Sequence, residues 1–377
     1  MLPFIVVEYE LKINYNVEEW RIIMKKLSTK GKITIIAVLV VFLTLVGSIC
    51  FYKYGLSATS SKNKEVVVQI PSGSTGNDII EILDNNDLLK VSLCAKIHLK
   101  LNDYAFKSNS YLLNKNMNTK EIFTVLEGND AKYISNTKIT VLDGQTIPEY
   151  AKTIEKQTGI KYEDIINKWK DKEYLNSLIN DYWFLTNDIL NNDIYYPLEG
   201  YLAPETYFLT QEDDIESITK MLLDQTKKNL DKYKNKISNF TINNKKVTIH
   251  EFITLSSIVQ RESSGHEKDR KLICGVLINR LNKPMPLQCD VTVNYGNQVV
   301  KIDVKQADLN SDTKYNTYKY MGLPVGAISS ISTDIIESVL NYKESDYYYF
   351  FATAKGKVLY AKTYQEHQEN VKNNKWY

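Results

Sequence analysis

The sequence predicts an α+β protein with one membrane-spanning helix, a small α+β region after it, and a larger mixed α/β region. Three observations predict this architecture: an uncharged apolar stretch, a strand–turn–helix pattern that occurs twice, and a long amphipathic helix in the second half. With 377 residues, the chain is long enough for two or three domains with cores of their own.

The apolar stretch at residues 33–52 carries no charge and has the length of one membrane-spanning helix. It is long for a signal-peptide core, and no clear small-x-small cleavage site follows it. Basic residues are denser before it than after it, which predicts a cytoplasmic N-terminus and an exported body. We interpret residues 1–32 as a cytoplasmic tail, in which residues 1–23 are either an upstream mis-start or a short tail without function. The alternative is a buried core helix.

Residues 53–64 are small and polar and are predicted to form a linker. Residues 65–131 follow as the first folded region. We predict two strands and two helices there, in alternating order: Val66–Ile70, Asn77–Leu83, Tyr111–Leu113 and Thr119–Leu126.

The second region, residues 132–377, opens with a similar unit. A strand at Ile139–Leu142 and a helix at Pro148–Ile154 flank a turn with the same x-Gly-x-Thr pattern as the first region. This is either a small module used twice or a chance similarity. Further along, we predict a helix over Lys268–Leu281 and a β-hairpin around Lys355-Gly356.

The most informative segment is the helix that ends near Glu262. Its apolar positions recur at helical spacing: Phe252, Leu255, Ile258 and Val259. With about 3.6 residues per turn, Glu262 lies above Leu255, so its carboxyl is aimed along the buried side. A carboxyl in an apolar site has a raised pKa and can act as a general acid near neutral pH. The alternative is a helix end that turns Glu262 out to solvent.

Composition excludes several other classes. The net charge of +2 gives no support to a nucleic-acid role. The four cysteines form no CxxC pair, and the four histidines have no metal-ligand spacing. A disulfide framework and a zinc site are therefore disfavoured.

Several segments match one known family in order. They are Ile70–Ser74, Leu198–Tyr207, Ser257–Glu262, Val276–Leu281, Leu287–Gly296, Tyr315–Tyr318, Gly322–Gly326 and Thr363–His367. On this ordered set, from about Val66 to the C-terminus, the chain resembles the YceG-like family of endolytic murein transglycosylases. The resemblance implies a LysM-like subdomain at residues 65–131 and a catalytic domain at 132–377.

The chain departs from the family at three positions. A second acid often stands where this chain has Gln260, and proline usually stands where it has Val291 and Val325. We take Glu262 as the catalytic match, because the pair Glu262-Ser263 also resembles the catalytic pair of other lytic transglycosylases.

By resemblance, the chain cuts nascent peptidoglycan glycan strands between N-acetylmuramic acid and N-acetylglucosamine, and leaves 1,6-anhydro ends. It needs one carboxyl, because the nucleophile is the C6 hydroxyl of the substrate itself. Glu262 would protonate the glycosidic oxygen and then take the C6 proton. The family implies no metal and no cofactor. The partners it implies are the glycan strands and, among proteins, peptidoglycan synthases and elongation or division proteins.

Eight residues are candidates for substrate binding: Gln288, Asp290, Asn316, Tyr318, Glu199, Tyr201, Glu205 and Ser263. Six of them have a structural alternative. Gln288 and Asp290 could lie on the outer face of a strand, and Asn316 could stabilise a turn. Glu199 and Glu205 could cap a loop, and Tyr201 could be core.

Two other functions remain open from the sequence. One is a wall-binding scaffold of the synthesis machinery that has lost catalysis. The other is a true muramidase-type hydrolase, in which Glu262 is the acid and Asp290 or Glu199 is the base.

Overall fold

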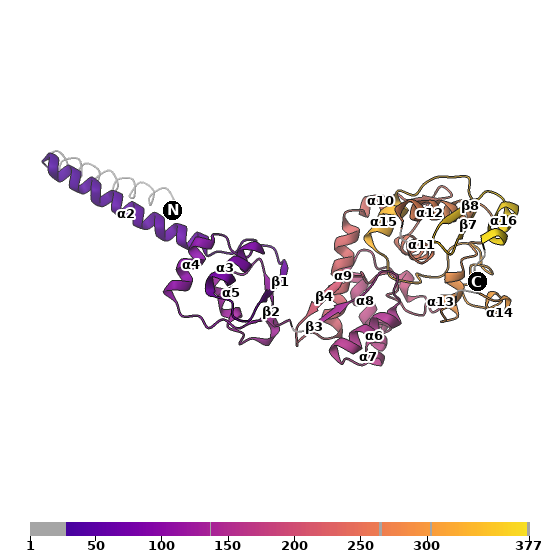
Figure 1. Cartoon of the computed structure of the whole chain (residues 1–377), viewed down its shortest axis with the longest axis horizontal. Coiled ribbons are helices and arrows are strands. Elements are labelled where there is room, and N and C mark those ends of the chain that lie inside the picture. The colour runs from indigo at the N-terminus through magenta and orange to yellow at the C-terminus, as the bar shows by residue number, and fades with distance from the viewer. Residues whose placement is uncertain (1–27, 136, 264–265, 302–303, 375–377) are drawn as a thin grey trace, which may run out of the picture. The chain divides into compact units, whose positions relative to one another are not determined.

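The computed structural model describes residues 28–135, 137–263, 266–301 and 304–374. The predicted tail at residues 1–23 lies outside these ranges. The chain divides into two compact units with the boundary between Ile134 and Ser135, and each unit is described by itself. The structure is mixed α+β and mostly helical, and the strands of the described residues form small two-stranded sheets (Figure 1).

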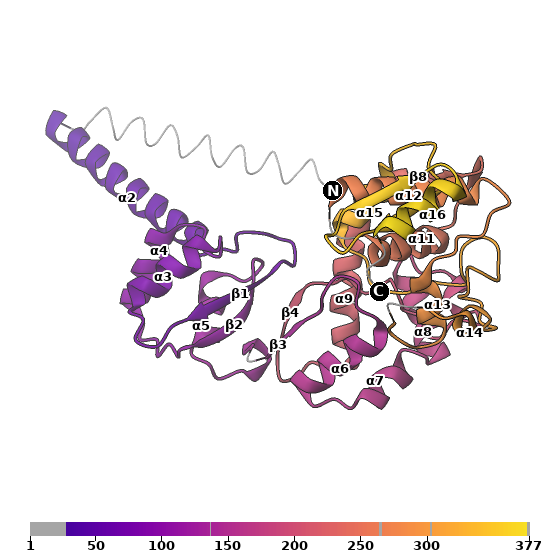
Figure 2. The same cartoon turned by 45° about the vertical axis from the view of Figure 1, so that its right-hand side comes forward.

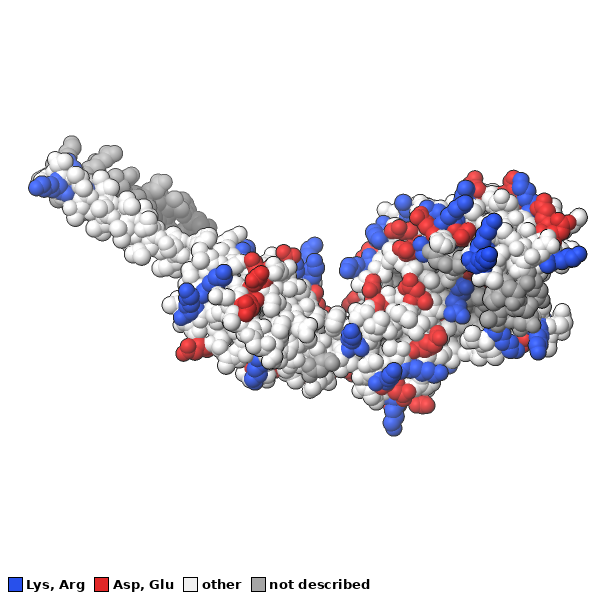
Figure 3. Space-filling view, in the orientation of Figure 1, with Lys and Arg blue, Asp and Glu red and all other residues white. Residues whose placement is uncertain are grey.

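The predicted membrane segment lies inside one helix, α2 (Thr29–Gly55). Within the described ranges it is the one helix long and apolar enough to cross a membrane, a test that a signal sequence also passes. Figure 3 shows no charged atoms along its middle. Its last turn packs on the first unit, because the Tyr52 hydroxyl lies 2.8 Å from Nδ1 of His98 and the following Leu56 is buried.

The first unit contains, in chain order, β1 (Glu65–Ile70), α3 (Gly76–Asn85), α4 (Ser92–Leu101), β2 (Asn109–Asn114), α5 (Thr119–Leu126) and the 3₁₀ turn η1 (Ala131–Tyr133). β1 and β2 are antiparallel, with Val68 opposite Tyr111, and both residues are buried. The two strands and two helices predicted here are confirmed, and α4 is an additional helix. The segment predicted as a linker also contacts this unit, since the Ser60 N–H donates to the Lys115 carbonyl at 3.0 Å.

The second unit begins with β3 (Thr137–Thr140), α6 (Ile147–Thr158), α7 (Tyr162–Lys168), α8 (Lys172–Asp181), η2 (Asn187–Leu190), β4 (Thr206–Leu209), α9 (Ile215–Asp231) and α10 (Lys234–Ser238). β3 and β4 form an antiparallel sheet, and α6 packs against β3. It continues with β5 (Thr241–Ile242), β6 (Lys245–Lys246), α11 (Ile249–Glu262), α12 (Glu267–Leu281), α13 (Asp290–Gly296), α14 (Gln306–Leu309), α15 (Thr333–Leu340), β7 (Tyr349–Ala352), β8 (Val358–Ala361) and α16 (Tyr364–Asn374).

The repeated x-Gly-x-Thr pattern has a common structural role. Thr75 and Thr146 are the N-caps of α3 and α6, and the acid three residues later in each helix accepts the threonine N–H. A capping box of this kind satisfies backbone donors that a helix start leaves free. The same short pattern therefore starts a helix after a strand in both units.

Helices α11, α12 and α15 pack against one another in the second unit. The β7–β8 hairpin lies against α12, and α16 packs on the hairpin (Figure 2). The predicted stripe of α11 is confirmed, because Phe252, Leu255, Ile258 and Val259 are all fully buried. The segment around Asp290 is a helix start and not the strand considered from the sequence. Gln288 adopts φ 52°, a left-handed backbone conformation that breaks any strand there.

Candidate active site

Glu262 is the last residue of α11 and is half-buried. The helix begins at a capping box, in which Thr248 and Glu251 bind each other's backbone N–H groups at 2.7 and 3.1 Å. It ends where the Ser263 N–H donates to the Val259 carbonyl at 3.1 Å. Every residue of α11 from Phe252 to Val259 is buried, so the helix runs through the interior of the second unit and ends at Glu262.

Burial is the main reason that the pKa of Glu262 rises from its usual 4.5 to about 7. The charge of Asp290 raises it further, because a second carboxylate nearby disfavours ionisation. A hydrogen bond from the Cys289 thiol and the charges of Arg280 and Arg261 act in the opposite direction. Glu262 is therefore a carboxyl that can hold a proton at neutral pH and can also release it.

Asp290 and Tyr318 lie on other elements, close enough to interact electrostatically with the Glu262 carboxyl. Asp290 is the first residue of α13, and its Oδ1 accepts a hydrogen bond from the Tyr318 hydroxyl at 2.6 Å. The loop behind them is tied together, since the Gln288 and Cys289 N–H groups donate to the backbone and side chain of Thr317 at 3.1 and 3.0 Å. The Gln288 side chain is exposed beside this loop.

Two residues at this site were not predicted as site residues. Cys289 is buried and hydrogen-bonds Glu262, and burial raises the pKa of its thiol well above the usual value. Arg280 on α12 is 7% exposed, and it donates to the Leu287 and Tyr348 carbonyls at 2.6 Å each. The motif segments contain both residues, but their contacts join distant parts of the chain.

Asn316 lies in the same loop but has no polar atom left for a ligand. Its amide nitrogen donates to the Leu309 and Ser311 carbonyls at 2.9 Å, and its oxygen accepts the Tyr318 and Lys319 N–H groups. The side chain is fully buried. Asn316 therefore anchors the loop, and it contributes to the site by accepting the backbone N–H of Tyr318.

Glu199 is 3% exposed and is enclosed by protein donors. Its carboxylate accepts the Ile147 N–H at 3.1 Å and the Tyr295 hydroxyl at 3.0 Å. Burial raises its pKa to about 8, and these two hydrogen bonds oppose the rise. Glu199 is therefore a second carboxyl with a raised pKa, but its hydrogen-bond partners are the buried Ile147 N–H and Tyr295 hydroxyl of the protein itself.

The other two residues of this loop lie in different surroundings. Tyr201 is 1% exposed, and its hydroxyl lies 2.7 Å from Nδ1 of His250. Glu205 is exposed and borders a hollow of about 430 Å³ with Asp143. Of the eight substrate-binding candidates, the structure therefore brings Asp290, Tyr318 and Ser263 close to Glu262.

Gly200 lets the Glu199 loop approach α11. It has φ +86°, and a Cβ there would lie 2.6 Å from Ala327 and 2.8 Å from Ile253. Such distances are below normal contact, so only glycine fits without a shift. The Leu198–Tyr207 motif is therefore packed directly on the helix that carries Glu262.

Comparisons with known proteins identify the family of the chain. Residues 68–373 match the YceG-like family. The chain is 34% identical over 325 residues to an endolytic murein transglycosylase of Bacillus subtilis strain 168, a match that covers 84% of this chain and 88% of that protein. A protein of the same name from Streptococcus pneumoniae D39 is 33% identical over 354 residues, and the match covers 88% of this chain and 63% of the relative.

A solved structure is also similar. The crystal structure of a YceG-like protein from Listeria monocytogenes has a TM-score of 0.58 and 34% identity, and the match covers 82% of this chain and 100% of that chain. The family match covers the first unit from residue 68 onward and nearly all of the second unit. The chain belongs to the YceG-like family.

Proposed function

We propose that this protein is a membrane-anchored endolytic lytic transglycosylase of peptidoglycan. It cleaves the bond between N-acetylmuramic acid and N-acetylglucosamine in nascent glycan strands, leaves 1,6-anhydro ends and so terminates strand elongation. The names of its relatives support the substrate, and the protonatable carboxyl of Glu262 is the observation that carries the chemistry.

In this mechanism Glu262 acts twice. As an acid it protonates the glycosidic oxygen while the bond to the anomeric carbon breaks. As a carboxylate it then removes the proton from the C6 hydroxyl, whose oxygen attacks the same carbon. A pKa of about 7 suits both steps, because neither protonation state is far from neutral pH. The Tyr318 hydroxyl and Asp290 supply polar groups beside the developing positive charge.

The surrounding organisation is part of the same proposal. Helix α2 is the membrane anchor, with the N-terminus in the cytoplasm and both units outside. Residues 65–131 are a LysM-like subdomain that contacts the strand, and residues 132–377 are the catalytic domain. Peptidoglycan synthases and elongation or division proteins are the proposed protein partners.

One observation favours a second candidate, a muramidase-type hydrolase. The charge of Asp290 raises the pKa of Glu262, so two carboxyl groups lie close to each other. A hydrolase needs such a pair, with one carboxyl as acid and the other as base or nucleophile. Water would then replace the C6 hydroxyl, and the product would be one water heavier.

The test is to incubate the full chain in detergent with un-crosslinked glycan strands and to weigh the products. Anhydro ends from the wild type and none from Glu262→Gln are expected. Reducing ends that disappear in Asp290→Asn would make the protein a hydrolase. Equal cleavage by wild type and Glu262→Gln would exclude Glu262 as the acid. Strand binding without cleavage by the wild type would favour the scaffold.

A further inference from the structure

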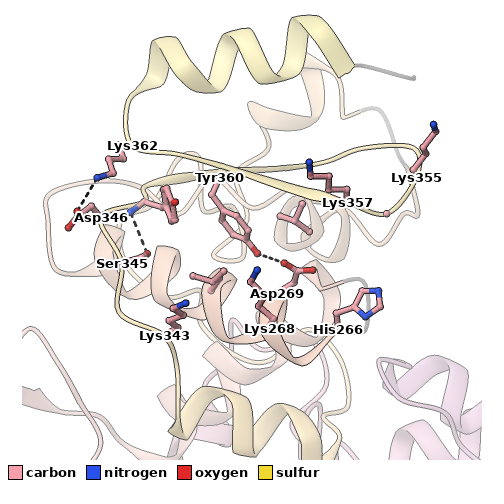
Figure 4. A pocket seen from close by; sticks show the side chains of 14 residues that line it. His266, Lys268, Asp269, Lys343, Ser345, Asp346, Lys355, Lys357, Tyr360 and Lys362 are labelled. Atoms are coloured by element: carbon pink, nitrogen blue, oxygen red, sulfur yellow. Dashed lines mark hydrogen bonds and ion pairs between the residues drawn. The ribbon is translucent and has the colours of Figure 1, made fainter.

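A cavity of about 780 Å³ lies between the start of α12 and the β7–β8 hairpin. Figure 4 shows Tyr360 crossing it from the hairpin toward Asp269 on α12, where the two side chains form a hydrogen bond of 2.8 Å. Lys355 and Lys357 stand on one side of this bond, and Lys343 stands on the other (Figure 4). The proposed chemistry at Glu262 uses none of these residues.

The cavity carries an excess of positive charge. Five lysines line it against two aspartates: Lys268, Lys343, Lys355, Lys357 and Lys362 against Asp269 and Asp346. Of the lysines, Lys362 pairs with Asp346 at 3.1 Å. The other four take part in no ion pair within the described ranges, and all four are exposed. Unpaired cations around a hollow attract an anionic ligand.

The cavity wall is not purely cationic. Apolar and aromatic side chains contribute to it, among them Leu272, Tyr347 and Val358. Asp346 lies at the surface, where its exposed carboxylate already pairs with Lys362 and can accept a second amine. A lining that mixes cations, one accessible anion and apolar surface suits a peptide with carboxylates, aliphatic groups and an amine. A uniform polyphosphate would meet the aspartates unfavourably.

The position of the cavity connects it to the proposed site. Asp269 and Arg280 are on the same helix, eleven positions apart, which corresponds to about 16 Å. Arg280 in turn lies close enough to Glu262 for its charge to lower the pKa of that carboxyl. Helix α12 therefore joins the cavity to the surroundings of Glu262. Each muramic acid unit of a glycan strand carries a short peptide, which extends about 3.5 Å per residue away from the sugar backbone.

We propose that this cavity binds the carboxylate-bearing stem peptide of the glycan strand whose sugar backbone lies at Glu262. This inference rests on the proposed function. Lys355 and Lys357 contact peptide carboxylates, and Asp346 accepts an amine where the peptide has one. The cavity thereby distinguishes strands that carry peptides from strands that have lost them.

The test measures binding without cleavage. The full chain carrying Glu262→Gln is held in detergent micelles and titrated with end-labelled glycan strands, either with stem peptides or after an amidase has removed them. The same titrations follow in the added double variant Lys355→Ala, Lys357→Ala. The matched control is Lys152→Ala, Lys156→Ala, which removes two exposed lysines of α6 instead.

We expect peptide-bearing strands to bind roughly tenfold more tightly than stripped strands, and the hairpin double variant to remove most of that difference. The control variant should keep the difference in affinity between peptide-bearing and stripped strands. Equal affinity for both kinds of strand overturns the inference but leaves the proposed function standing. Failure of both strands to bind counts against the proposed function itself. If labelled poly(glycerol phosphate) binds the Glu262→Gln chain more tightly than peptide-bearing strands do, and loses that affinity in the hairpin variant, the ligand is a phosphate polymer and the inference is wrong.

Discussion

Glu262 and Glu199 are two acidic residues of the second unit whose pKa values burial raises, to about 7 and about 8. Their surroundings differ. The oxygens of Glu199 are enclosed by the Ile147 N–H and the Tyr295 hydroxyl. Glu262 is half-buried at a helix end, beside a loop that brings other polar groups to it. Burial therefore raises the pKa of both acids, and the two differ in how accessible they are, which is why we propose Glu262 as the catalyst and Glu199 as a structural acid.

The strongest test of this comparison is to neutralise each acid. Glu262→Gln should lower kcat by roughly 1,000-fold or more, because the group that transfers the proton is lost. Glu199→Gln should lower it by less than roughly tenfold, because an amide oxygen still accepts the hydrogen bonds that hold the loop. Product release from glycan strands, followed by chromatography, gives both numbers.

Circular dichroism of both variants serves as the control for folding. A Glu199→Gln enzyme as inactive as Glu262→Gln, with native spectra for both, would reverse the assignment of catalyst and structural acid.

Truncating Glu199 should have the largest effect on stability. Glu199→Ala leaves the buried Ile147 N–H and Tyr295 hydroxyl without their acceptor, which should reduce the free energy of unfolding by about 2–4 kcal/mol. Urea unfolding in detergent measures it. Glu205→Ala is the control, because that side chain is exposed and should change stability by about 0.5 kcal/mol or less. Similar losses in both variants would contradict the buried network.

The pH dependence of activity follows from Glu262. The acid must be protonated to donate, so kcat/KM should fall about tenfold per pH unit above a pKa of about 7. A profile that is flat from pH 6 to pH 9 would show that proton donation by Glu262 does not limit the rate.

The same group makes stability depend on pH. Its pKa is raised in the folded state from 4.5 to about 7, so the folded protein holds the proton more tightly than the unfolded chain. That stabilisation is complete below pH 4.5 and is lost as the pH rises through 7. At pH 8, Glu262→Gln should therefore be more stable than the wild type, by up to about 3 kcal/mol. The stability of Glu262→Gln minus that of the wild type should be larger at pH 8 than at pH 5. A smaller difference at pH 8 would contradict the raised pKa of Glu262.

Arg280 connects the Glu262 region to the hairpin. Arg280→Gln removes a charge that lowers the pKa of Glu262, so the alkaline limb of kcat/KM should move to higher pH. It also weakens two buried hydrogen bonds to carbonyls, at a cost of about 2 kcal/mol. A loss of stability with an unmoved pH profile would leave Arg280 with a structural role alone.

The smallest expected effect is at Tyr201. Tyr201→Phe removes one hydrogen bond to His250 and should cost about 1 kcal/mol in stability with kcat and KM unchanged. Thermal unfolding and strand cleavage test the two parts. A rise in KM would place Tyr201 in contact with the sugar and would weaken the contrast between enclosed and accessible groups.

Local signals predicted the elements that position the site. The spacing of Leu255, Ile258 and Val259 predicted buried positions of α11, and the x-Gly-x-Thr pattern preceded two predicted helices, which the structure caps with Thr75 and Thr146. These features depend on neighbours within one or two turns, which a sequence displays directly.

The remaining contacts could not be read in this way. Cys289 meets Glu262 across 27 positions, and the carbonyl of Tyr348 meets Arg280 across 68. Asn316 shows a further difficulty, because an amide that binds sugar and an amide that anchors a loop have the same letter in the sequence. The left-handed conformation of Gln288 was likewise not predicted. It rules out the strand that was one alternative for this segment, and a helix starts there instead.

The junction of α2 with the first unit has a mechanical consequence. The Tyr52 hydroxyl bonds His98, Leu56 is buried, and a Cβ at Gly55 would overlap Cys94. A slack tether would let a membrane protein sample many heights above the bilayer. When the final turn of the helix is packed into the folded unit that follows, the connection is rigid. The tilt and depth of the helix then determine the position of that unit. If α2 spans a bilayer, the first unit therefore stands at a height set to within about one helical turn, roughly 5 Å.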